Sequence, residues 1–395
     1  MPESPLRPQI AIVSPFVDKR HGTELCLAEQ IEHLATTFDI HLYSERVEDI
    51  DVSRITWHRV RMPPGPHLFR YVWWLFANHF LRWRDRKFRG LVPEAIYSPG
   101  VNCFDADLIS VHEIFGNLRR QLGSQLRIGR NPWRAWPVLV HRRIYYWLAE
   151  TLENRVYPRA SVVLTTNSLK ISRDLQELYG FRKTPPVLYY GVDSKKFSPA
   201  RCNELRDAAR KSLGLSGDMF AVLLIGNDWK KKGLPCLLEA LGLLGNPHVR
   251  VLVVGKDAPA MYQESIRRLG LFDQVSFLPS RPDVEVYYAA ADVCAMPSME
   301  EAFSLPPAEA MSCGLPVIVS RAAGVSEIIH HGEDGLVLEN PADARTLSEM
   351  IGRLYDDTAW RDKLGKAATV TAGQYTWERN ARELGEILNS ILETR

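Results

Sequence analysis

The chain has 395 residues, of which 46% are hydrophobic and 24% charged, and its formal net charge is +2. This length exceeds one ordinary hydrophobic core and suits two domains of about 190 residues, while the composition excludes a fibrous or disordered chain. No apolar run approaches the roughly 20 residues that span a bilayer. The longest candidate, at 71–81, is interrupted by Asn78 and His79.

The N-terminal sequence MPESPLRPQIAIVSPF has no apolar stretch of the signal-peptide type. Cysteines lie at positions 26, 103, 202, 236, 294 and 313, without a CxxC pair or the spacing of metal ligands. This pattern predicts buried thiols in a reducing compartment, so we expect a cytoplasmic protein.

Apolar runs alternate with amphipathic helical stretches along the chain. In the first half, strands are predicted at 9–14, 39–43, 55–60, 108–111, 161–165 and 186–189, with a helix at 24–35. In the second half, strands are predicted at 220–225, 250–254, 274–277, 293–296 and 316–319. Strands separated by helices favour parallel sheets covered on both faces. The predicted fold class is α/β, with two doubly wound, Rossmann-like domains facing a central cleft.

The domain boundary is predicted between Tyr190 and Pro199, where Gly, Asp, Lys and Pro interrupt the apolar pattern. We expect an N-terminal domain at 1–192 and a C-terminal domain at 193–375. The segment 376–395 is predicted to form a last helix that packs back toward the first domain.

The segment 297–320, PSMEEAFSLPPAEAMSCGLPVIVS, contains two glutamates, Glu301 and Glu309. Proline is tolerated in the first turn of a helix, so a helix is predicted to begin near Ser304 to Pro306 and to end before Gly314. Glu301 then lies in the preceding loop and Glu309 within the helix. The positive N-terminal end of such a helix suits a phosphate group.

This segment resembles the E-x7-E motif of the family 4 (group 1) glycosyltransferases, which have the GT-B fold. The sequences VLYYGVDSKKFSP, LLIGNDWKKKG and GVSEIIHHGEDGLVLENPADARTLSEMI also resemble that family and occur in the same order. The resemblance covers essentially the whole second domain and parts of the first. It implies transfer of a sugar from a nucleotide-sugar donor, with retention of anomeric configuration and without a metal or other cofactor.

The resemblance assigns roles to residues of the second domain. Glu309 matches the glutamate that binds the donor ribose, and Glu301 the one that contacts the transferred sugar. Lys232 matches the lysine that neutralises the donor pyrophosphate, where a fixed cation stabilises the charge of the leaving group. The alternative for the run 230–232 is an ordinary exposed cluster of charges.

Further donor contacts are implied around these three residues. The family often has arginine where this chain has Asn227. Lys231 is therefore expected to help Lys232 neutralise the negative charge of the donor pyrophosphate. Glycine is usual at the position of Ser304, and serine there would narrow the sugar pocket. The other expected contacts are the backbone N–H groups of Phe303, Ser304 and Leu305.

Two places in the first domain match the family. Gly22 and Thr23 resemble the glycine-rich loop that approaches the donor phosphate, with His21 in place of a first glycine. His112 resembles the histidine at the end of a strand that faces the donor sugar. A lone histidine is also common as a purely structural residue.

Asp105 and Asp107 form a DxD pair, the metal-binding signature of the other large transferase fold. Here the pair precedes a predicted strand instead of following one, and Asp107 is expected to close the loop that leads into it. We therefore predict no metal.

Basic residues are concentrated in the first half of the chain. Residues 1–195 have 27 Lys and Arg against 20 Asp and Glu, and seven of the ten tryptophans lie between Trp57 and Trp147. In the segment 69–89, FRYVWWLFANHFLRWRDRKFR, the aromatics come first and then Arg82, Arg84, Arg86, Lys87 and Arg89. Each cation near an anionic bilayer contributes about 1 kcal/mol.

This pattern predicts a peripheral enzyme on the inner face of the membrane, with a glycan or lipid-linked acceptor, that builds a surface polysaccharide or glycolipid. The competing interpretation is that the aromatics pack a core and the arginines are solvated.

Rival functions are a nucleotide-sugar epimerase or a phosphorylase of similar architecture, and a non-catalytic protein that binds sugar nucleotides. A phosphorylase normally needs a pyridoxal-phosphate lysine, which the sequence does not indicate. The acidic second half argues against nucleic acid as a partner.

Overall fold

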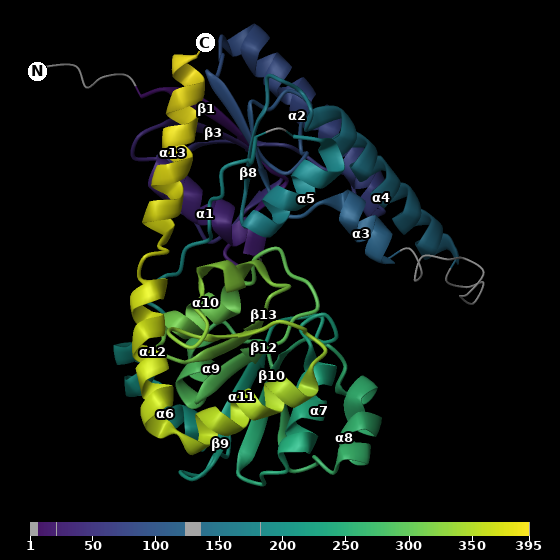
Figure 1. Ribbon diagram of the computed structural model, residues 1–395. Helices are drawn as coiled ribbons and strands as arrows, with labels where there is room; N and C mark the ends of the chain where they lie inside the picture. Colours follow the sequence, from purple (N-terminus) through teal and green to yellow (C-terminus); the bar gives the residue numbers. More distant parts are fainter. Residues whose placement is uncertain (1–6, 21, 123–135, 182, 395) are drawn as a thin grey trace, which may run out of the picture. The chain divides into compact units, whose positions relative to one another are not determined.

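The computed structural model describes residues 7–20, 22–122, 136–181 and 183–394 (Figure 1). The chain forms two compact units. Unit 1 contains residues 1–189 and 377–395, and unit 2 contains residues 190–376. The chain thus enters unit 2 at Tyr190, at the start of the predicted boundary, and its last helix belongs to unit 1.

Unit 1 is built on a parallel sheet with the strand order β5-β3-β1-β6-β7-β8. These strands are β1 (Gln9–Val13), β3 (Asp39–Ser44), β5 (Thr56–Arg59), β6 (Ala95–Pro99), β7 (Leu108–Val111) and β8 (Val163–Thr166). Two short strands, β2 (Phe16–Val17) and β4 (Arg46–Val47), pair separately. The helices are α1 (Gly22–Leu34), α2 (His67–Arg89), α3 (Phe115–Leu122), α4 (Trp136–Val156), α5 (Leu169–Tyr179) and α13 (Trp377–Glu393), with a 3₁₀ turn at Val52–Arg54.

Unit 2 is built on a second parallel sheet, with the order β11-β10-β9-β12-β13-β14. These strands are β9 (Phe220–Ile225), β10 (Val249–Gly255), β11 (Val275–Pro279), β12 (Val293–Met296), β13 (Val317–Ser320) and β14 (Leu336–Leu338). The helices are α6 (Pro199–Ser212), α7 (Leu234–Leu244), α8 (Gln263–Leu269), α9 (Glu285–Ala290), α10 (Leu305–Ser312), α11 (Ala344–Asp356) and α12 (Thr358–Ala372), with 3₁₀ turns at Pro259–Tyr262 and Gly324–Ile328.

Both sheets have the strand order of doubly wound nucleotide-binding folds. Numbered along each unit, the order is 3-2-1-4-5-6, and the direction of winding reverses between the first and fourth strands. In unit 2 these strands are β9 and β12, which pair in parallel. Ligands of open α/β sheets bind beyond the carboxyl ends of the strands at this reversal. The loops after β9 and β12 are therefore the place to look for a site.

The predicted strands differ from the structure at three places. The strand expected at 186–189 is wrong, since only an isolated bridge joins Val187 to Thr166. Pro185 and Pro186 have no N–H to donate to a neighbouring strand. The strands β6 and β14 were not predicted, because β6 ends in a proline and β14 has only three residues.

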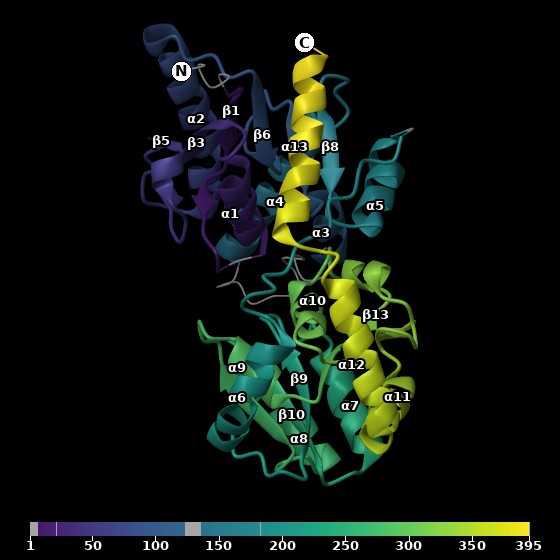
Figure 2. The same ribbon diagram turned by 90° about the vertical axis from the view of Figure 1, so that its left-hand side faces the viewer.

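The last helix, α13, completes the core of unit 1 (Figure 2). Its side chains Leu384 and Leu388 are fully buried in the same cluster as Leu27 and Ile31 of α1. A buried hydrogen bond of 2.8 Å also joins Gln30 Nε2 to Asn380 Oδ1. The apolar spacing of α13 is therefore satisfied by unit 1, although the helix follows unit 2 in sequence.

The six cysteines are all buried free thiols. Among the helices of the described residues, none is long and apolar enough to cross a bilayer.

Helix α2 is anchored to unit 1 by polar side chains on one of its faces. Asp85 is fully buried, and its carboxylate lies 2.8 Å from Nδ1 of His58 on β5. The hydroxyl of Tyr43 donates to the same carboxylate at 3.3 Å, and His41 lies 2.9 Å from His58. These groups connect α2 to β3 and β5 through a buried cluster.

This cluster predicts that the chain loses stability as the pH falls below about 6.5. Burial lowers the pKa of His58 from its ordinary value, and the nearby His41 lowers it further. The unfolded chain therefore takes up a proton at His58 before the folded chain does. The contribution of His58 to stability is fully present above the unfolded pKa and is lost as the pH falls toward the folded one. Urea unfolding at neutral and mildly acidic pH measures this loss.

The His58→Gln variant should lose less stability on acidification than the wild-type chain. The His248→Gln variant is the control, because His248 is exposed on unit 2. Equal losses in all three proteins would contradict the assignment to His58.

Candidate functional site

The loop after β9 is shaped by two glycines. Gly226 has φ +132°, and a Cβ atom there would lie 2.9 Å from Cε of Lys232. Gly233, with φ +85°, begins α7, and a Cβ atom there would lie 2.0 Å from the carbonyl oxygen of Pro297. Both contacts are closer than a Cβ atom permits. Glycine at 226 therefore lets the side chain of Lys232 lie against the end of β9, and glycine at 233 lets α7 approach the loop after β12.

Lys232 meets Glu301 beyond the ends of the two central strands of unit 2. Nζ of Lys232 lies 3.0 Å from Oε1 of Glu301, and only 12% and 17% of these side chains are exposed. Nζ also donates a long hydrogen bond of 3.5 Å to Oγ of Ser304. The pair places a fixed cation and a carboxylate side by side at the topological reversal of the sheet.

The other predicted residues of the β9 loop lie differently. The carboxamide oxygen of Asn227 accepts a hydrogen bond of 3.1 Å from the backbone N–H of Lys256, so it ties this loop to the one after β10. Lys230 is exposed, whereas Lys231 is half-buried. The backbone oxygen of Lys231 accepts from Met299 N–H at 2.8 Å. Lys232 thus pairs with Glu301.

The loop after β12 leads into α10, which begins at Leu305 with Pro306 and Pro307 in its first turn. Phe303 is buried, and its ring meets that of Tyr190 edge-on, with the centroids 5.3 Å apart. Its backbone oxygen accepts from Val325 N–H at 2.8 Å. Pro306 and Pro307 have no N–H group, so the unpaired donors expected at the start of a helix are here limited to residues such as Leu305. Because this loop is anchored, the N-terminal end of α10, where the helix dipole is positive, has a fixed position in unit 2.

Ser304 has φ +83°, a backbone region that favours glycine. We expect Ser304→Gly to stabilise the protein by about 1 kcal/mol, because glycine adopts this conformation without steric strain. The melting temperature of unit 2 should rise by about 2–4 °C. The Ser304→Ala variant is the control, because it removes the hydroxyl and keeps the strain. If Ala stabilised the protein as much as Gly, the backbone conformation would not be the cause.

Glu309 lies within α10 and is held by a residue of another helix. The hydroxyl of Tyr288 on α9 donates to Oε2 of Glu309 at 2.5 Å. Burial raises the pKa of Glu309, and the hydrogen bond from Tyr288 opposes that increase. The ring of Tyr288 is fixed in turn by edge-on packing against Phe197. The carboxylate is therefore held in one orientation by Tyr288.

The predicted residues of unit 1 follow two different strands. Gly22 and Thr23 are the first two residues of α1, after β1 and the short β2. His21 lies outside the described residues. His112 directly follows β7, and burial lowers the pKa of its imidazole to about 4. His112 is therefore neutral at neutral pH and able to donate or accept a hydrogen bond. Strand β6 lies between β1 and β7 in the sheet.

The family model for glycosyl transferases group 1 matches residues 206–371. A D-inositol 3-phosphate glycosyltransferase of Corynebacterium urealyticum is 29% identical over 252 residues, which are 60% of this chain and 59% of that protein. The second unit of the chain is therefore similar to the group 1 glycosyltransferases. The chain spans less than two thirds of the length of this curated relative.

Two solved structures share the fold of this chain. WaaG, a glycosyltransferase involved in lipopolysaccharide biosynthesis, superimposes with a TM-score of 0.75 at 18% identity, covering 96% of this chain and 99% of that one. The Anabaena protein Alr3699/HepE, solved in complex with UDP-glucose, gives a TM-score of 0.68 at 20% identity, covering 97% and 99%. The predicted GT-B fold is confirmed.

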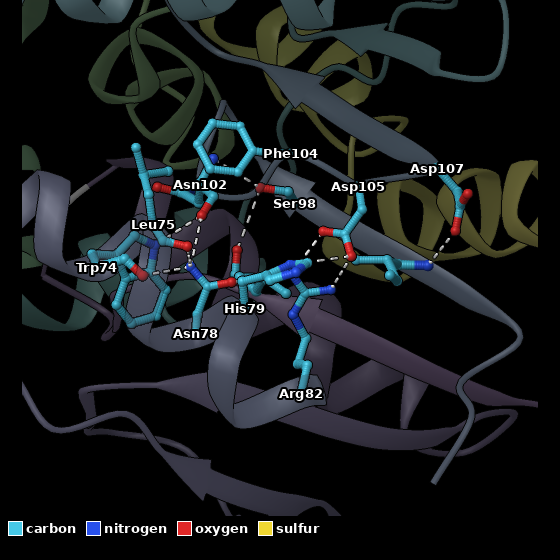
Figure 3. A network of polar contacts seen from close by, with 12 residues as sticks. Trp74, Leu75, Asn78, His79, Arg82, Ser98, Asn102, Phe104, Asp105 and Asp107 are labelled. Atoms are coloured by element: carbon cyan, nitrogen blue, oxygen red, sulfur yellow. Dashed lines mark hydrogen bonds and ion pairs between the residues drawn. The ribbon is translucent and has the colours of Figure 1, made fainter. Parts of the chain in front are cut away.

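Both aspartates of the DxD pair are engaged within unit 1 (Figure 3). Arg82 of α2 donates to both carboxylate oxygens of Asp105, at 2.7 and 2.8 Å. Asp107 Oδ2 accepts from Ile96 N–H at 2.8 Å, so Asp107 joins the starts of β6 and β7 as expected. Among the described residues, no cluster of His, Cys, Asp and Glu has the arrangement of a metal site. The carboxylates of both aspartates are thus hydrogen-bonded within unit 1.

Two residues of the candidate site were not identified from the sequence. Tyr288 orients Glu309 from 21 residues away, and its local sequence, VYYAA, resembles an ordinary buried helix. Gly226 makes room for Lys232, and only its place directly after a buried strand indicates a close approach. Both depend on contacts that form when separate elements pack together.

Proposed function

We propose that the chain transfers a sugar from a nucleotide-sugar donor to an acceptor hydroxyl, with retention of anomeric configuration. The observation that supports this best is the Lys232–Glu301 pair at 3.0 Å, located between the ends of β9 and β12. A diphosphate needs a fixed cation and unpaired N–H groups, and this place in unit 2 offers both Lys232 and the start of α10.

In this proposal each residue of unit 2 has a separate role. Lys232, with Lys231 beside it, neutralises the diphosphate, and Asn227 holds their loop in place. Glu301 contacts the transferred sugar, and Glu309 binds the ribose hydroxyls. The backbone N–H groups of Phe303, Ser304 and Leu305 complete the donor contacts.

The residues of unit 1 act on the same donor in this proposal. The N–H groups of Gly22 and Thr23, at the start of α1, approach the phosphate. His112 accepts or donates a hydrogen bond at the transferred sugar. Its neutral form suits this role, because an imidazolium would favour the leaving phosphate over the neutral sugar.

The proposed reaction takes place on one face of the donor sugar. The bond from the anomeric carbon to the phosphate oxygen breaks, and the nucleoside diphosphate leaves with the electron pair. The acceptor oxygen forms the new bond on the same face, and its proton passes to the departing phosphate oxygen. Lys232 stabilises the charge that develops on that phosphate. No covalent enzyme intermediate and no metal ion take part.

We propose a glycan or lipid-linked acceptor and a role in surface polysaccharide or glycolipid synthesis at the inner face of the membrane. This part is supported by exposed aromatic residues of α2, such as Phe76 and Phe80, and by exposed basic residues near its C-terminal end, such as Arg86 and Lys87. The curated relative that bears the name D-inositol 3-phosphate glycosyltransferase makes this small anionic polyol a second acceptor to test.

A two-step experiment tests the proposed function. A thermal-shift screen with nucleoside diphosphates and their sugars should find one base that raises the melting temperature. Release of nucleoside diphosphate is then measured with that donor and with candidate acceptors, and the anomeric configuration of the product is determined by NMR. Conversion of the donor without an acceptor would indicate an epimerase. Binding without either reaction would indicate a sugar-nucleotide-binding protein.

Activity should survive removal of divalent cations. The expected rate with EDTA equals the rate without it, because the diphosphate is neutralised by Lys232 and the carboxylates of the DxD pair are engaged by Arg82 and Ile96. The assay compares enzyme dialysed against EDTA with the same enzyme after addition of Mg²⁺ or Mn²⁺. Complete loss of activity that either ion restores would contradict the proposal.

A further inference from the structure

Five aromatic side chains form an exposed stripe along α2. Their exposed fractions range from 46% to 66%. Successive members are four, three, four and three residues apart, and a helix turns about 100° per residue, so they lie on one face. The members of this outer aromatic face are Phe69, Trp73, Phe76, Phe80 and Trp83.

The opposite face of α2 is fixed to unit 1. Trp74 is fully buried, and its indole N–H donates to the carbonyl oxygen of Asn102 at 3.0 Å. Asn78 donates to the same oxygen, and Arg82 is buried in its ion pair with Asp105 (Figure 3). These contacts hold the helix in one rotational position. The outer aromatic face therefore cannot turn inward to be buried by its own domain.

The structure corrects one part of the sequence-based interpretation of this segment. Arg82 was expected among the cations of an anionic binding surface, but 8% of its side chain is exposed and it pairs with Asp105. The reason is its position one turn after Asn78, on the buried face of the helix. Trp74 packs in the core, as the competing interpretation expects, whereas Arg82 is neither solvated nor part of a binding surface.

Exposed cations lie at the C-terminal end of α2. Arg84 and Lys87 continue the outer aromatic face, because they follow Phe80 and Trp83 by four residues. Arg89 lies on another face of the helix, and both it and Arg84 pair with Asp85. Arg84, Arg86, Lys87 and Arg89 are all exposed, and Nζ of Lys87 lies 5.2 Å from the centre of the Trp83 ring. The only acidic residue of α2 is Asp85, which is fully buried. The exposed charge of this helix is therefore entirely positive.

We propose that the outer aromatic face, with Lys87 and Arg84 on it and Arg86 beside it, forms a membrane-binding surface for an anionic bilayer. Aromatic rings suit the region between headgroups and acyl chains, and arginine and lysine suit anionic headgroups. A second copy of the chain is a poorer occupant, since it would bury several cations for which α2 offers no exposed acidic partner. The inference rests on the proposed function in one respect, because a lipid-linked acceptor would lie in that bilayer.

Vesicle co-sedimentation of the full chain, without donor or acceptor, tests the proposal. Vesicles of phosphatidylcholine with about one third phosphatidylglycerol should bind the protein at least tenfold more tightly than phosphatidylcholine alone. Binding should weaken strongly between roughly 0.1 M and 1 M salt, because salt screens the headgroup charge. No binding to either vesicle, or equal binding to both, would overturn the proposal.

Variants distinguish binding through the outer aromatic face from non-specific adsorption to vesicles. The double variant Phe76→Ser/Phe80→Ser should bind anionic vesicles at least tenfold more weakly, as should Arg86→Glu/Lys87→Glu. The control is Phe272→Ser, which changes an equally exposed phenylalanine of unit 2 and should bind like the wild-type chain. If the control lost as much binding as the double variants, vesicle binding would not be specific to the outer aromatic face. If the double variants converted a dimer to a monomer without changing vesicle binding, the partner of this face would be a second copy of the chain. Either result would overturn the proposal.

The donor measurement distinguishes failure of this inference from failure of the proposed function. The variants of α2 should keep the thermal shift that the nucleoside diphosphate gives with the wild-type chain. Normal donor binding without vesicle binding would overturn the membrane surface alone. Normal vesicle binding without any response to nucleotides would leave the membrane surface and reject the proposed function.

Discussion

Replacing Lys232 by alanine should lower the turnover number by a factor of about 100 to 1,000, which is the usual effect of removing one group that stabilises developing negative charge. Lys232 pairs with Glu301, and its side chain is held against Gly226. Without Lys232, no fixed cation neutralises the negative charge of the leaving diphosphate. The carboxylate of Glu301 then lies near the diphosphate without a counter-charge. Steady-state rates of nucleoside diphosphate release at saturating donor measure the effect.

The matched control is Lys230→Ala, which removes an exposed lysine from the same loop. This variant should keep a rate close to that of the wild-type chain. Gly226→Ala should lower the rate without removing any charge, because its Cβ atom would displace Cε of Lys232. Equal rates for Lys232→Ala and Lys230→Ala would show that the predicted cation is not the one that acts.

Replacing Glu309 by alanine should weaken donor binding by about 100-fold, as expected from the loss of two charge-assisted hydrogen bonds to ribose hydroxyls. The fold should not suffer, because burial raises the pKa of Glu309 and its carboxylate is costly to keep charged in the free protein. Calorimetric titration with the nucleoside diphosphate measures the affinity, and the melting temperature without ligand checks the fold.

Two further variants test the role of orientation at Glu309. Tyr288→Phe keeps the ring and removes the hydroxyl that holds the carboxylate, so binding should weaken less than in Glu309→Ala. Glu349→Ala is the control, because Glu349 is exposed on α11 of the same unit. Unchanged affinity in Glu309→Ala would mean that the ribose is bound elsewhere.

Much of the fold and part of the site could be predicted from local patterns. Four-residue strands such as β7 and β12 are completely apolar or nearly so, and their ends were predicted correctly because turn residues bound them. The start of α10 was predicted within a residue, since proline fits only the first turn of a helix. The same reasoning placed Glu301 in a loop and Glu309 in a helix.

The long helix α2 illustrates what such patterns leave open. Its aromatic residues are spread over both faces, so composition alone does not distinguish a core helix from a surface one. The structure buries Trp74 and Arg82 and leaves Phe76 and Phe80 exposed. That division depends on Asp105 and His58, which come from other parts of the chain.

The sequence by itself determined the alternation of strands and helices, the order of the motifs and the residue types available for chemistry, because these depend on local spacing and on turn residues. Only the tertiary structure decided how Glu301 is paired, that Tyr288 orients Glu309, and that α13 completes unit 1. The physical reason is that each of these contacts joins residues from separate elements. Their distances are set by strand order and by close approaches such as that of Gly233 to Pro297, which no local pattern encodes.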